Sequence, residues 1–310
     1  MNEIFSLKQF GVSIGYERIE KLGDPLDEIN KIINWNDFSK YLHQNKGVGR
    51  HGYDPIILFK MLFLQSCYGI SDEELEYQVA DRISFQKFLG FPNNIPDYST
   101  VWYFREELSN GNTIDELWNE IRKQIENKGI KFSKGVIQDA KFIHADPGKK
   151  NSGMEDRGRG EPSSRNEDGS WTKKGDKNIF GYKLHDKIDK DNKFITRFAV
   201  TTAKTHDGNI DLAESNEINY RDRGYSGCTT KAKGDGTMKR GKLTPHEKLR
   251  NKRISKIRSR VEHPYAFMDR TLNAGYTKLT EIHRVFVQQA FVCIAYNLHR
   301  LNFLLKKLVA

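Results

Sequence analysis

The first part of the chain carries apolar residues at the spacing of helices. The segment 55–69, PIILFKMLFLQSCYG, is apolar on most of its faces, which is typical of a buried helix. Gly69 can end this helix, and Ser71, with a glutamate three positions later, predicts the start of the next one. We therefore expect residues 20–125 to be helical throughout.

A loop interrupts these helices where Gly90, Pro92 and Pro96 occur close together. Either Asp97 or Ser99 can cap the helix that follows, TVWYFREELS. A helix, a turn and a polar-capped helix in this order resemble a helix-turn-helix, which is a DNA-binding motif. Many helical bundles have the same order, so the pattern leaves DNA contact and a purely structural role open.

Alternation replaces the helical spacing in the second part of the chain. KGVIQDAKFIHAD begins as an apolar strand that we expect to end at Asp139. Residues 180–189 and 193–203 alternate well enough to be two strands joined by a polar turn. Residues 217–221 predict a brief fourth strand that ends at Asp222. Strands and helices mixed within one region indicate an α/β fold.

The segments between and after these strands predict a loop and three helices. Residues 146–178 are rich in Gly, Ser, Asn, Lys and Asp, which is typical of a flexible loop. A short helix is expected at 208–216, with Asp207 as a cap, and a further helix at 255–272. An amphipathic helix spans 281–307, and its regularly spaced apolar residues are predicted to be core: Phe286, Ala290, Ile294, Leu298, Leu301 and Leu305.

The change of pattern divides the 310 residues into a helical domain at 1–130 and an α/β domain at 131–310. No apolar run approaches the roughly 18 residues of a membrane span, and the N-terminus lacks a signal peptide's apolar stretch. We therefore expect a cytoplasmic protein with no membrane partner. Three widely separated cysteines, Cys67, Cys228 and Cys293, argue against disulfides and against a cysteine-based zinc site.

The net charge of +10 is concentrated in one basic segment, residues 228–260. Between Lys231 and Arg260 the chain has twelve Lys and Arg residues and two acids, which accounts for the whole excess. Charge this dense favours a polyanionic partner through the release of counterions. A solvated basic loop with no dedicated partner is the alternative interpretation of the charge alone.

Three acids stand out by their positions. Asp139 and Asp222 follow predicted strands, and side chains at strand ends face the rim of a sheet, where binding sites form. Glu262 lies in a predicted helix beside Arg258 and Arg260. Taken singly, a strand-end Asp is often a turn residue, and Glu262 is as consistent with a salt-bridge partner.

Several ordered blocks carry a resemblance to a known family. In the first half they are GRHGYDPIILFKMLFLQ, SDEELEYQVADRISFQKFLGF and PDYSTVWYFREEL. In the second half they are QDAKFIHA, GYKLH, AKTHDGN, YRDRGYSG and RSRVEHPYAFM. Over roughly residues 25–305 the chain resembles the bacterial and archaeal insertion-sequence DDE transposases of family five, which are related to family four.

The resemblance implies an RNase H-like mixed sheet with flanking helices behind an all-helical N-terminal domain. It matches Asp139, Asp222 and Glu262 to the catalytic, metal-binding triad, and the predicted strand order agrees with it. Such a site holds two Mg²⁺ ions, with Mn²⁺ as a substitute, that activate a nucleophile and stabilise the leaving oxygen. The implied reaction is cleavage at the element's ends followed by strand transfer into target DNA.

The implied partner is double-stranded DNA, both terminal inverted repeats and target, bound by a homodimer associated with the nucleoid. Two weaker candidates for an accessory role are His185 and Lys183. The candidate DNA-binding residues are Arg258, Arg260, Lys252, Arg253, Arg270 and Tyr225.

Departures from the family pattern keep two other functions open. Asp269 occupies a position where the family usually has a phosphate-binding Lys, Ser255 replaces a frequent Tyr, and the connection 211–220 is short. These departures favour a catalytically degenerate DNA-binding relic of a transposase as the alternative to an active enzyme. A stand-alone RNase H-like nuclease acting on RNA or junctions is a third hypothesis, against which the helical domain and the basic segment argue.

Overall fold

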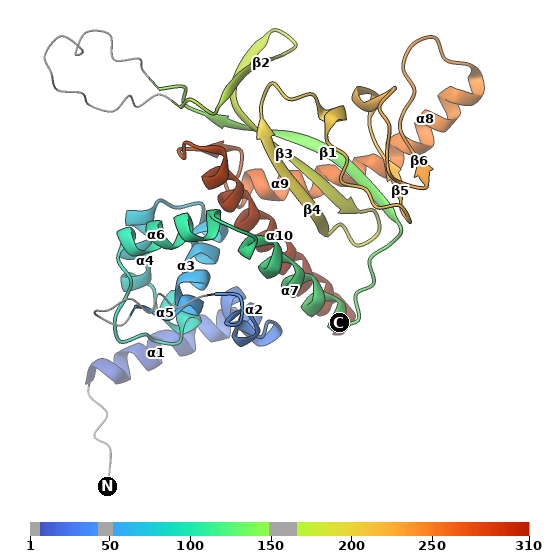
Figure 1. Ribbon diagram of the computed structural model, residues 1–310. Coiled ribbons are helices and arrows are strands. Elements are labelled where there is room, and N and C mark those ends of the chain that lie inside the picture. The colour runs from blue at the N-terminus through green and yellow to red at the C-terminus, as the bar shows by residue number, and fades with distance from the viewer. Residues whose placement is uncertain (1–6, 43–51, 149–165, 310) are drawn as a thin grey trace, which may run out of the picture. The chain divides into compact units, whose positions relative to one another are not determined.

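The computed structural model describes residues 7–42, 52–148 and 166–309 (Figure 1). The chain forms two compact units. One unit comprises residues up to Lys128 together with those from Leu298 onward, and the other comprises Gly129–Asn297. The chain therefore changes unit near the predicted boundary at residue 130, but its last residues pack with the N-terminal unit and not with the α/β unit.

The described part of the N-terminal unit is helical, as predicted, and residues 43–51 of the predicted range lie outside the described residues. Its core is a cluster of aromatic rings, in which Trp35 lies 5.7 Å from Phe59, 5.7 Å from Phe63 and 5.4 Å from Phe88 between ring centroids. Its elements are α1 (Leu7–Leu22), α2 (Pro25–Ile32), a 3₁₀ turn η1 (Trp35–Phe38), α3 (Pro55–Tyr68), α4 (Asp72–Asp81), α5 (Ile83–Leu89), α6 (Tyr98–Ser109) and α7 (Thr113–Asn127).

The predicted helix ends of this unit are confirmed. Gly69 ends α3 in the left-handed conformation at φ 60°, which glycine adopts without steric cost. The Ser71 hydroxyl accepts a hydrogen bond of 3.2 Å from the backbone N–H of Glu74, and the Asp97 carboxylate accepts one of 2.7 Å from Thr100. The buried faces of α3 agree with its apolar pattern.

The predicted helix-turn-helix stays a prediction. The α6 sequence has a single basic residue, Arg105, which is buried and donates 3.0 Å to Asp72 and 2.8 Å to Gln65. The preceding α4 carries five acids and no Lys or Arg. Because DNA phosphates attract cations, neither helix supplies the charge that a phosphate contact needs.

The second unit is built around a mixed sheet. Its strands are β1 (Gly135–Ala145), β2 (Ser170–Lys174), β3 (Lys177–Asp189), β4 (Ile195–Thr202), β5 (Ile218–Tyr220), β6 (Gly234–Asp235) and β7 (Tyr276–Thr277). Its helices and 3₁₀ turns are η3 (Asp207–Asn209), η4 (Arg223–Tyr225), α8 (Pro245–Arg258), η5 (Ser259–Val261), α9 (Glu262–Arg270) and α10 (Ile282–Val309), of which α10 continues into the N-terminal unit.

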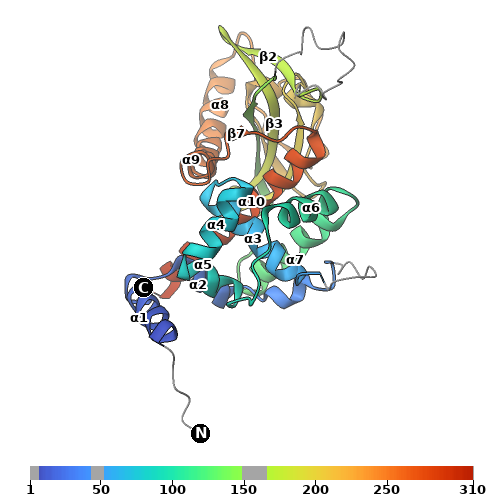
Figure 2. The same cartoon turned by 90° about the vertical axis from the view of Figure 1, so that its left-hand side faces the viewer.

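The strand order confirms the predicted α/β, RNase H-like core. Across the sheet the main strands run β4-β3-β1-β5-β6. β3 and β4 are antiparallel neighbours, β3 is antiparallel to β1, β5 is parallel to β1, and β6 is parallel to β5. Figures 1 and 2 show α9 and the first part of α10 against one face of this sheet. Among the described residues, no helix is long and apolar enough to cross a membrane.

Two predicted boundaries of this unit are wrong. β1 does not end at Asp139 but continues to Ala145, because every residue from Val136 to His144 pairs with β3. The predicted loop 146–178 is wrong over 170–178, where β2 turns tightly back into β3. Composition alone misses this strand because its side chains are mostly polar and exposed. Residues 149–165 of the same prediction lie outside the described residues.

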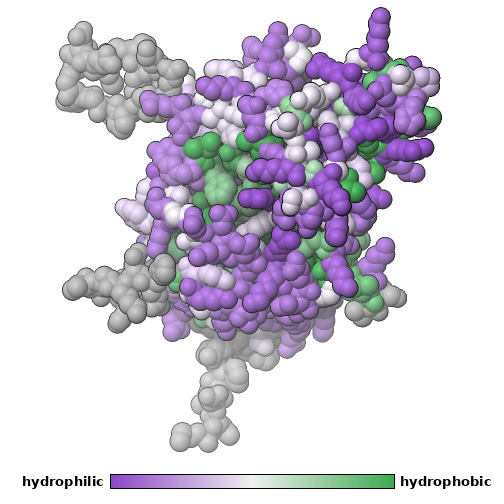
Figure 3. Space-filling model, turned by 45° about the vertical axis from the view of Figure 1, so that its right-hand side comes forward, coloured by the Kyte–Doolittle hydropathy of each residue, from purple (hydrophilic) through white to green (hydrophobic). Residues whose placement is uncertain are grey.

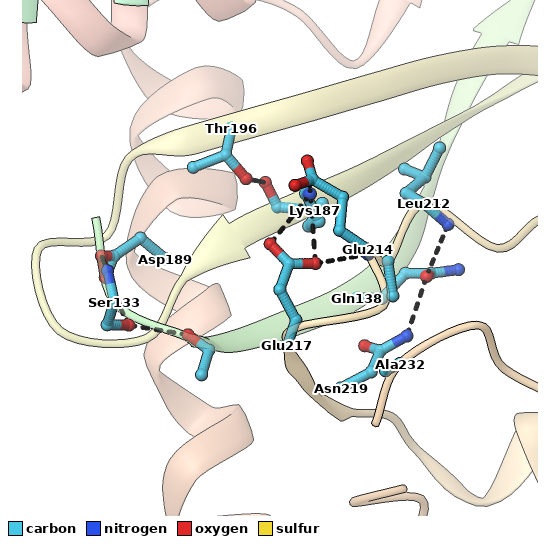
Figure 4. A network of polar contacts seen from close by, with 12 residues as sticks. Ser133, Gln138, Lys187, Asp189, Thr196, Leu212, Glu214, Glu217, Asn219 and Ala232 are labelled. Atoms are coloured by element: carbon cyan, nitrogen blue, oxygen red, sulfur yellow. Dashed lines mark hydrogen bonds and ion pairs between the residues drawn. The ribbon is translucent and has the colours of Figure 1, made fainter. Parts of the chain in front are cut away.

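The helix predicted at 208–216 is also wrong. Only the single 3₁₀ turn η3 forms, and its cap is the His206 ring, whose Nδ1 accepts a 3.0 Å hydrogen bond from Gly208, in place of Asp207. Polar contacts hold the rest of this connection extended. Gln138 accepts a hydrogen bond of 3.0 Å from the backbone of Leu212, and Glu217 accepts one of 2.7 Å from Glu214 (Figure 4).

The predicted helix at 255–272 begins earlier than expected, within the basic segment. α8 begins at Pro245 behind a capping box formed by Thr244 and Glu247. The helix predicted at 255–272 is therefore the end of α8 and all of α9, separated by the 3₁₀ turn η5. The predicted last helix is confirmed as α10, where Ala290, Ile294, Leu298 and Leu301 are buried.

Candidate active site

The two candidate aspartates lie at equivalent levels of neighbouring parallel strands. In the pairing of β1 with β5, Ile137 lies opposite Tyr220. Asp139 follows Ile137 by two residues, and Asp222 follows Tyr220 by two residues with extended backbone angles. Side chains two apart along a strand share one face, so the two carboxylates lie side by side where β5 ends.

A buried arginine fixes the chain around Asp222. Arg221 is fully buried and donates 2.8 Å to the Thr237 hydroxyl and 3.1 Å to each of two carbonyl oxygens, those of Thr229 and Cys228. These bonds tie β5 to the chain that follows it. Asp222 itself caps η4 by accepting a 2.7 Å hydrogen bond from the backbone N–H of Gly224. The RDRGY sequence thus encodes the turn that presents the second aspartate.

A third aspartate, Asp207, approaches the pair. η3 packs against η4, and Gly208 permits this because a Cβ there would collide with the sulfur of Cys228. The Lys183 ammonium holds Asp207 through an ion pair of 2.8 Å and donates 2.7 Å to the carbonyl of Thr205. Lys183 therefore acts on the site indirectly, by positioning Asp207. The sequence pattern indicated only a helix cap at Asp207.

The charge balance around Asp139 is the main electrostatic feature of the site. Burial raises the pKa of the Asp139 carboxyl to about 6, the Arg258 guanidinium opposes the rise, and Asp222 and Asp207 add to it. Arg258 Nη2 lies 2.9 Å from Asp139 Oδ2. About 20% of the Asp139 side chain remains exposed, so a cation from solvent can still reach it.

Glu262, the third member of the predicted triad, is not brought to the two aspartates. It begins α9, directly after η5, and its side chain is exposed. Within the described ranges 7–42, 52–148 and 166–309, no group of three or more His, Cys, Asp or Glu side chains is arranged to hold a metal ion. The carboxylates of Asp139, Asp222 and Asp207 nevertheless supply hard oxygen donors, and their mutual repulsion favours a cation.

A buried carboxyl behind Asp139 was missed in the sequence. Asp186 lies directly opposite Asp139 in the β1–β3 pairing and is fully buried, with Cys293 of α10 at 3.9 Å. Lys141, two residues after Asp139, is paired with Asp269 of α9. The signal in the sequence was an acid at a core-facing position of β3, between Leu184 and Ile188.

Because Asp186 is buried, we expect Asp186→Asn to increase the thermal stability of the protein by an amount that depends on pH. Burial raises the pKa of Asp186 to about 8, and the nearby charges of Lys141 and Asp139 act in opposite directions. Unfolding then releases a proton between pH of about 4 and 8, so stability falls with rising pH by at most about 1.4 kcal/mol per unit. Asn cannot ionise, so we expect the variant to have a melting temperature above that of the wild type at pH 8.

Thermal unfolding at pH 5 and pH 8 measures this difference. At pH 5 the wild-type carboxyl is already protonated, so the advantage of Asp186→Asn should shrink. Asp191→Asn, at a carboxylate that is 49% exposed, is the matched control and should show no gain that grows with pH. An advantage of the same size at both pH values would contradict an ionisation at Asp186.

Two candidate residues, His185 and Tyr225, are buried and not exposed on the surface of the site. His185 points to the sheet face opposite Asp139, is fully buried and contacts the Thr201 hydroxyl at 2.8 Å. Burial lowers the pKa of His185 to about 4, so its ring is neutral near pH 7. Tyr225 is 1% exposed, so its ring has no surface for the predicted DNA contact; it packs under the Arg221 guanidinium instead.

The other candidate DNA-binding residues are on the surface. Lys252, Arg253, Arg260 and Arg270 are exposed, and the first two lie on α8. Figure 3 shows α8 and its surroundings, at the upper right, as predominantly hydrophilic. Only Asn251 and Ile254 of α8 are buried, so this helix presents most of its cations to solvent.

Two family models match the chain. Residues 15–107 match the transposase domain DUF772, and residues 130–298 match the transposase DDE domain. The second match alone covers more than half of the 310 residues. The chain belongs to the DDE transposase family. No solved structure matches this transposase. Its assignment to family five stays a prediction.

Membership of this family establishes the general activity. The transposase is an enzyme of the polynucleotidyl transferase and endonuclease class, it acts on DNA, and its chemistry depends on divalent metal ions. The matched DDE domain includes Asp139, Asp222 and Glu262. The match coincides closely with the α/β unit, so the site described above lies within the domain that carries the activity.

Proposed function

We propose that this transposase cuts DNA at the ends of a mobile element and joins the freed ends to target DNA, with Asp139, Asp222 and Glu262 as metal ligands. The observation that carries the proposal is the side-by-side position of Asp139, on β1, and Asp222, just after the end of the neighbouring β5. Glu262 follows η5 at the end of the basic segment, so a shift of α9 is needed to bring it to the pair.

The donor set fits a hard divalent cation. Carboxylate oxygens are the ligands that Mg²⁺ prefers, and Mn²⁺ accepts the same ligands. Arg258 offsets only one of the negative charges here, since Asp222 and Asp207 also act on Asp139. Two bound ions would supply the activation of a nucleophile and the stabilisation of the leaving oxygen. Asp222, fixed through Arg221 and Gly224, would hold its ligand oxygen in a set orientation.

The basic α8 supports a role in gripping DNA beside the site. Its exposed Lys252 and Arg253 lie within two turns of Arg258, the last residue of the helix, which contacts Asp139. Arg260 and Arg270 extend the exposed positive charge into η5 and α9. Cations at this spacing can bind consecutive phosphates of a duplex while the scissile phosphate reaches Asp139.

The double variant Lys252→Gln/Arg253→Gln should weaken duplex binding similarly for all sequences. If each residue neutralises one phosphate, the slope of log K against log salt should fall by about two. Fluorescence anisotropy across a salt series measures this slope. Lys31→Gln/Lys123→Gln removes two cations of the helical unit that are 69% and 63% exposed, and serves as the control. Equal slopes in both variants would contradict a specific role of α8.

The cleavage proposal is tested with a labelled duplex that bears the element's own terminal repeat. Wild-type protein is incubated with Mg²⁺, with Mn²⁺ or with EDTA, and the products are separated by length. Metal-dependent cuts at the repeat boundary, followed by joining to a second duplex, are expected. Light scattering with and without end DNA tests the proposed homodimer, which should form on two ends.

A catalytically degenerate DNA-binding protein is the second candidate. The observations that favour it are the exposed position of Glu262 and the acid Asp269 at a position predicted to bind phosphate. Asp269 instead pairs with Lys141, which is buried two residues after Asp139, so the charges of both side chains are neutralised within the protein. Specific binding of the terminal repeat without any metal-dependent cut would favour this candidate.

A further inference from the structure

Arg258 joins the basic helix to the first aspartate of the site. It is the last residue of α8, its side chain is 18% exposed, and its Nη2 donates 2.9 Å to Asp139 Oδ2. Asp139 is held at the same time near the like charges of Asp222 and Asp207. The guanidinium is therefore the positive charge that compensates a crowded group of carboxylates.

The same carboxylate oxygen is needed for the proposed metal. A lone pair of Asp139 Oδ2 that accepts a hydrogen bond from Arg258 is not free to ligate a divalent ion in the same direction. Two positive charges on one carboxylate also repel each other. Metal binding at Asp139 must therefore work against this ion pair, and anything that draws Arg258 away should favour the metal.

A DNA phosphate is the group best suited to draw Arg258 away. Guanidinium forms paired hydrogen bonds with phosphate oxygens as readily as with a carboxylate. The exposed cations of α8, among them Lys252 and Lys256, would bring a phosphate backbone to the same helix. Only the turn η5 separates Arg258 from Glu262, so a shift of this segment toward DNA moves the third predicted ligand as well.

We propose that Arg258 is an internal counter-ion of Asp139 that couples DNA binding to metal binding. Without DNA, Arg258 occupies Asp139 and weakens the metal site. When α8 binds a duplex, Arg258 transfers to a phosphate and Asp139 becomes available. Because such coupling is reciprocal, the metal should tighten DNA binding by the same factor, and couplings of this kind are typically about 5- to 150-fold. The inference rests on the proposed role of Asp139 as a metal ligand.

The test is calorimetric titration of Mn²⁺ into the full-length protein, with and without a duplex that carries an uncleavable linkage at the cut site. The titration into duplex alone is subtracted. Wild type is compared with Arg258→Gln, and with Arg258→Lys as a milder change that keeps the charge. Arg122→Gln is the matched control, since Arg122 also pairs with a carboxylate, that of Glu126, but lies on α7 of the helical unit.

Wild type should bind Mn²⁺ at least about fivefold more tightly with DNA than without it. Arg258→Gln should bind Mn²⁺ more tightly than wild type when DNA is absent, and should gain less from DNA. DNA phosphates that ligate Mn²⁺ directly raise its affinity in wild type and in Arg258→Gln alike. The difference between the two DNA-induced increases in Mn²⁺ affinity therefore measures the part that depends on Arg258. Arg258→Lys should fall between them, and Arg122→Gln should match the wild type.

An Arg258→Gln protein with wild-type Mn²⁺ affinity and a wild-type gain from DNA would overturn the counter-ion role and leave the proposed function intact. Mn²⁺ binding that is unchanged by Asp139→Asn would instead overturn the metal site itself. Unfolding curves recorded for each variant separate a loss of fold from a loss of coupling. If Arg258→Gln does not fold, the comparison of Arg258→Lys with wild type and Arg122→Gln decides the inference.

Discussion

Asp139→Asn should lower metal-dependent cleavage of element-end DNA by at least about a thousandfold. Stabilisation by bound metal is worth several kcal/mol in the transition state, and each 1.36 kcal/mol corresponds to about a factor of ten in rate. Asn keeps the size of the side chain and its place in β1, but it removes the negative charge that a divalent ion requires. The variant also loses the charge that pairs with Arg258.

Binding and fold should survive this substitution. The basic helix α8 stays in place and Arg258 is released from the carboxylate, so Asp139→Asn should bind end DNA at least as tightly as wild type. Burial already holds the pKa of Asp139 at about 6, so a neutral side chain at this position removes a buried charge and should not unfold the unit. Band-shift assays and thermal unfolding check both expectations.

Aspartates elsewhere in the chain provide the comparison. Asp191→Asn alters a carboxylate that is 49% exposed and lies on the turn after β3, and should cut DNA like wild type. Asp222→Asn and Glu262→Gln should each be as damaging as Asp139→Asn if all three act as ligands. Undiminished cutting by Asp139→Asn would reject the triad. Specific binding with no cutting even by wild type would identify a degenerate transposase.

The sheet could be predicted because its signal is local. Alternation over 180–189 and 193–203 specifies two strands and their turn, and the structure pairs them as β3 and β4. The end of β1 could not be predicted in the same way. Lys141 is a charged residue that faces the core, and its charge is met by Asp269, which lies far away in the sequence. No local pattern contains that contact.

The candidate site was only partly accessible to sequence analysis, for a similar reason. The order of the strands places Asp139 and Asp222 at similar heights along the sheet, so it could be expected that their side chains lie close together. The positions of Asp207 and Asp186 depend on how η3 packs on η4 and how β3 pairs with β1. A helix is expected with Asp207 as its cap, but the bond from Leu212 to Gln138 of β1 and the local bond from Glu214 to Glu217 override that preference.

The short connection between β4 and β5 depends on one buried lysine. Lys187 is 1% exposed and forms ion pairs of 3.0 Å with Glu214 and 3.0 Å with Glu217 (Figure 4). Glu217 is itself only 11% exposed and accepts a backbone hydrogen bond from Glu214. Two glutamates of the connection therefore pair with a lysine of β3, and these ion pairs hold the connection in place without a helix.

Lys187→Ala should destabilise the protein by about 3–5 kcal/mol, because it leaves Glu217 buried without its cation. The double variant Lys187→Met/Glu217→Gln removes both charges and should recover a large part of this loss, since a neutral pair needs no compensation. Urea unfolding followed by circular dichroism gives the free energies. Lys190→Ala, at an exposed pair with Asp191, should change stability by less than about 1 kcal/mol.

The measured stability of Lys187→Ala bears on whether the short connection is a sign of a catalytically degenerate transposase. The connection leads into β5 and thus to Asp222, so its loss of order should also loosen the second aspartate. If Lys187→Ala costs no more than Lys190→Ala, the buried ion pairs do not hold the connection, and its shortness would weigh toward a degenerate transposase. A large cost with recovery in the double variant would mean that the buried ion pairs keep this segment ordered next to the site, as an active enzyme requires.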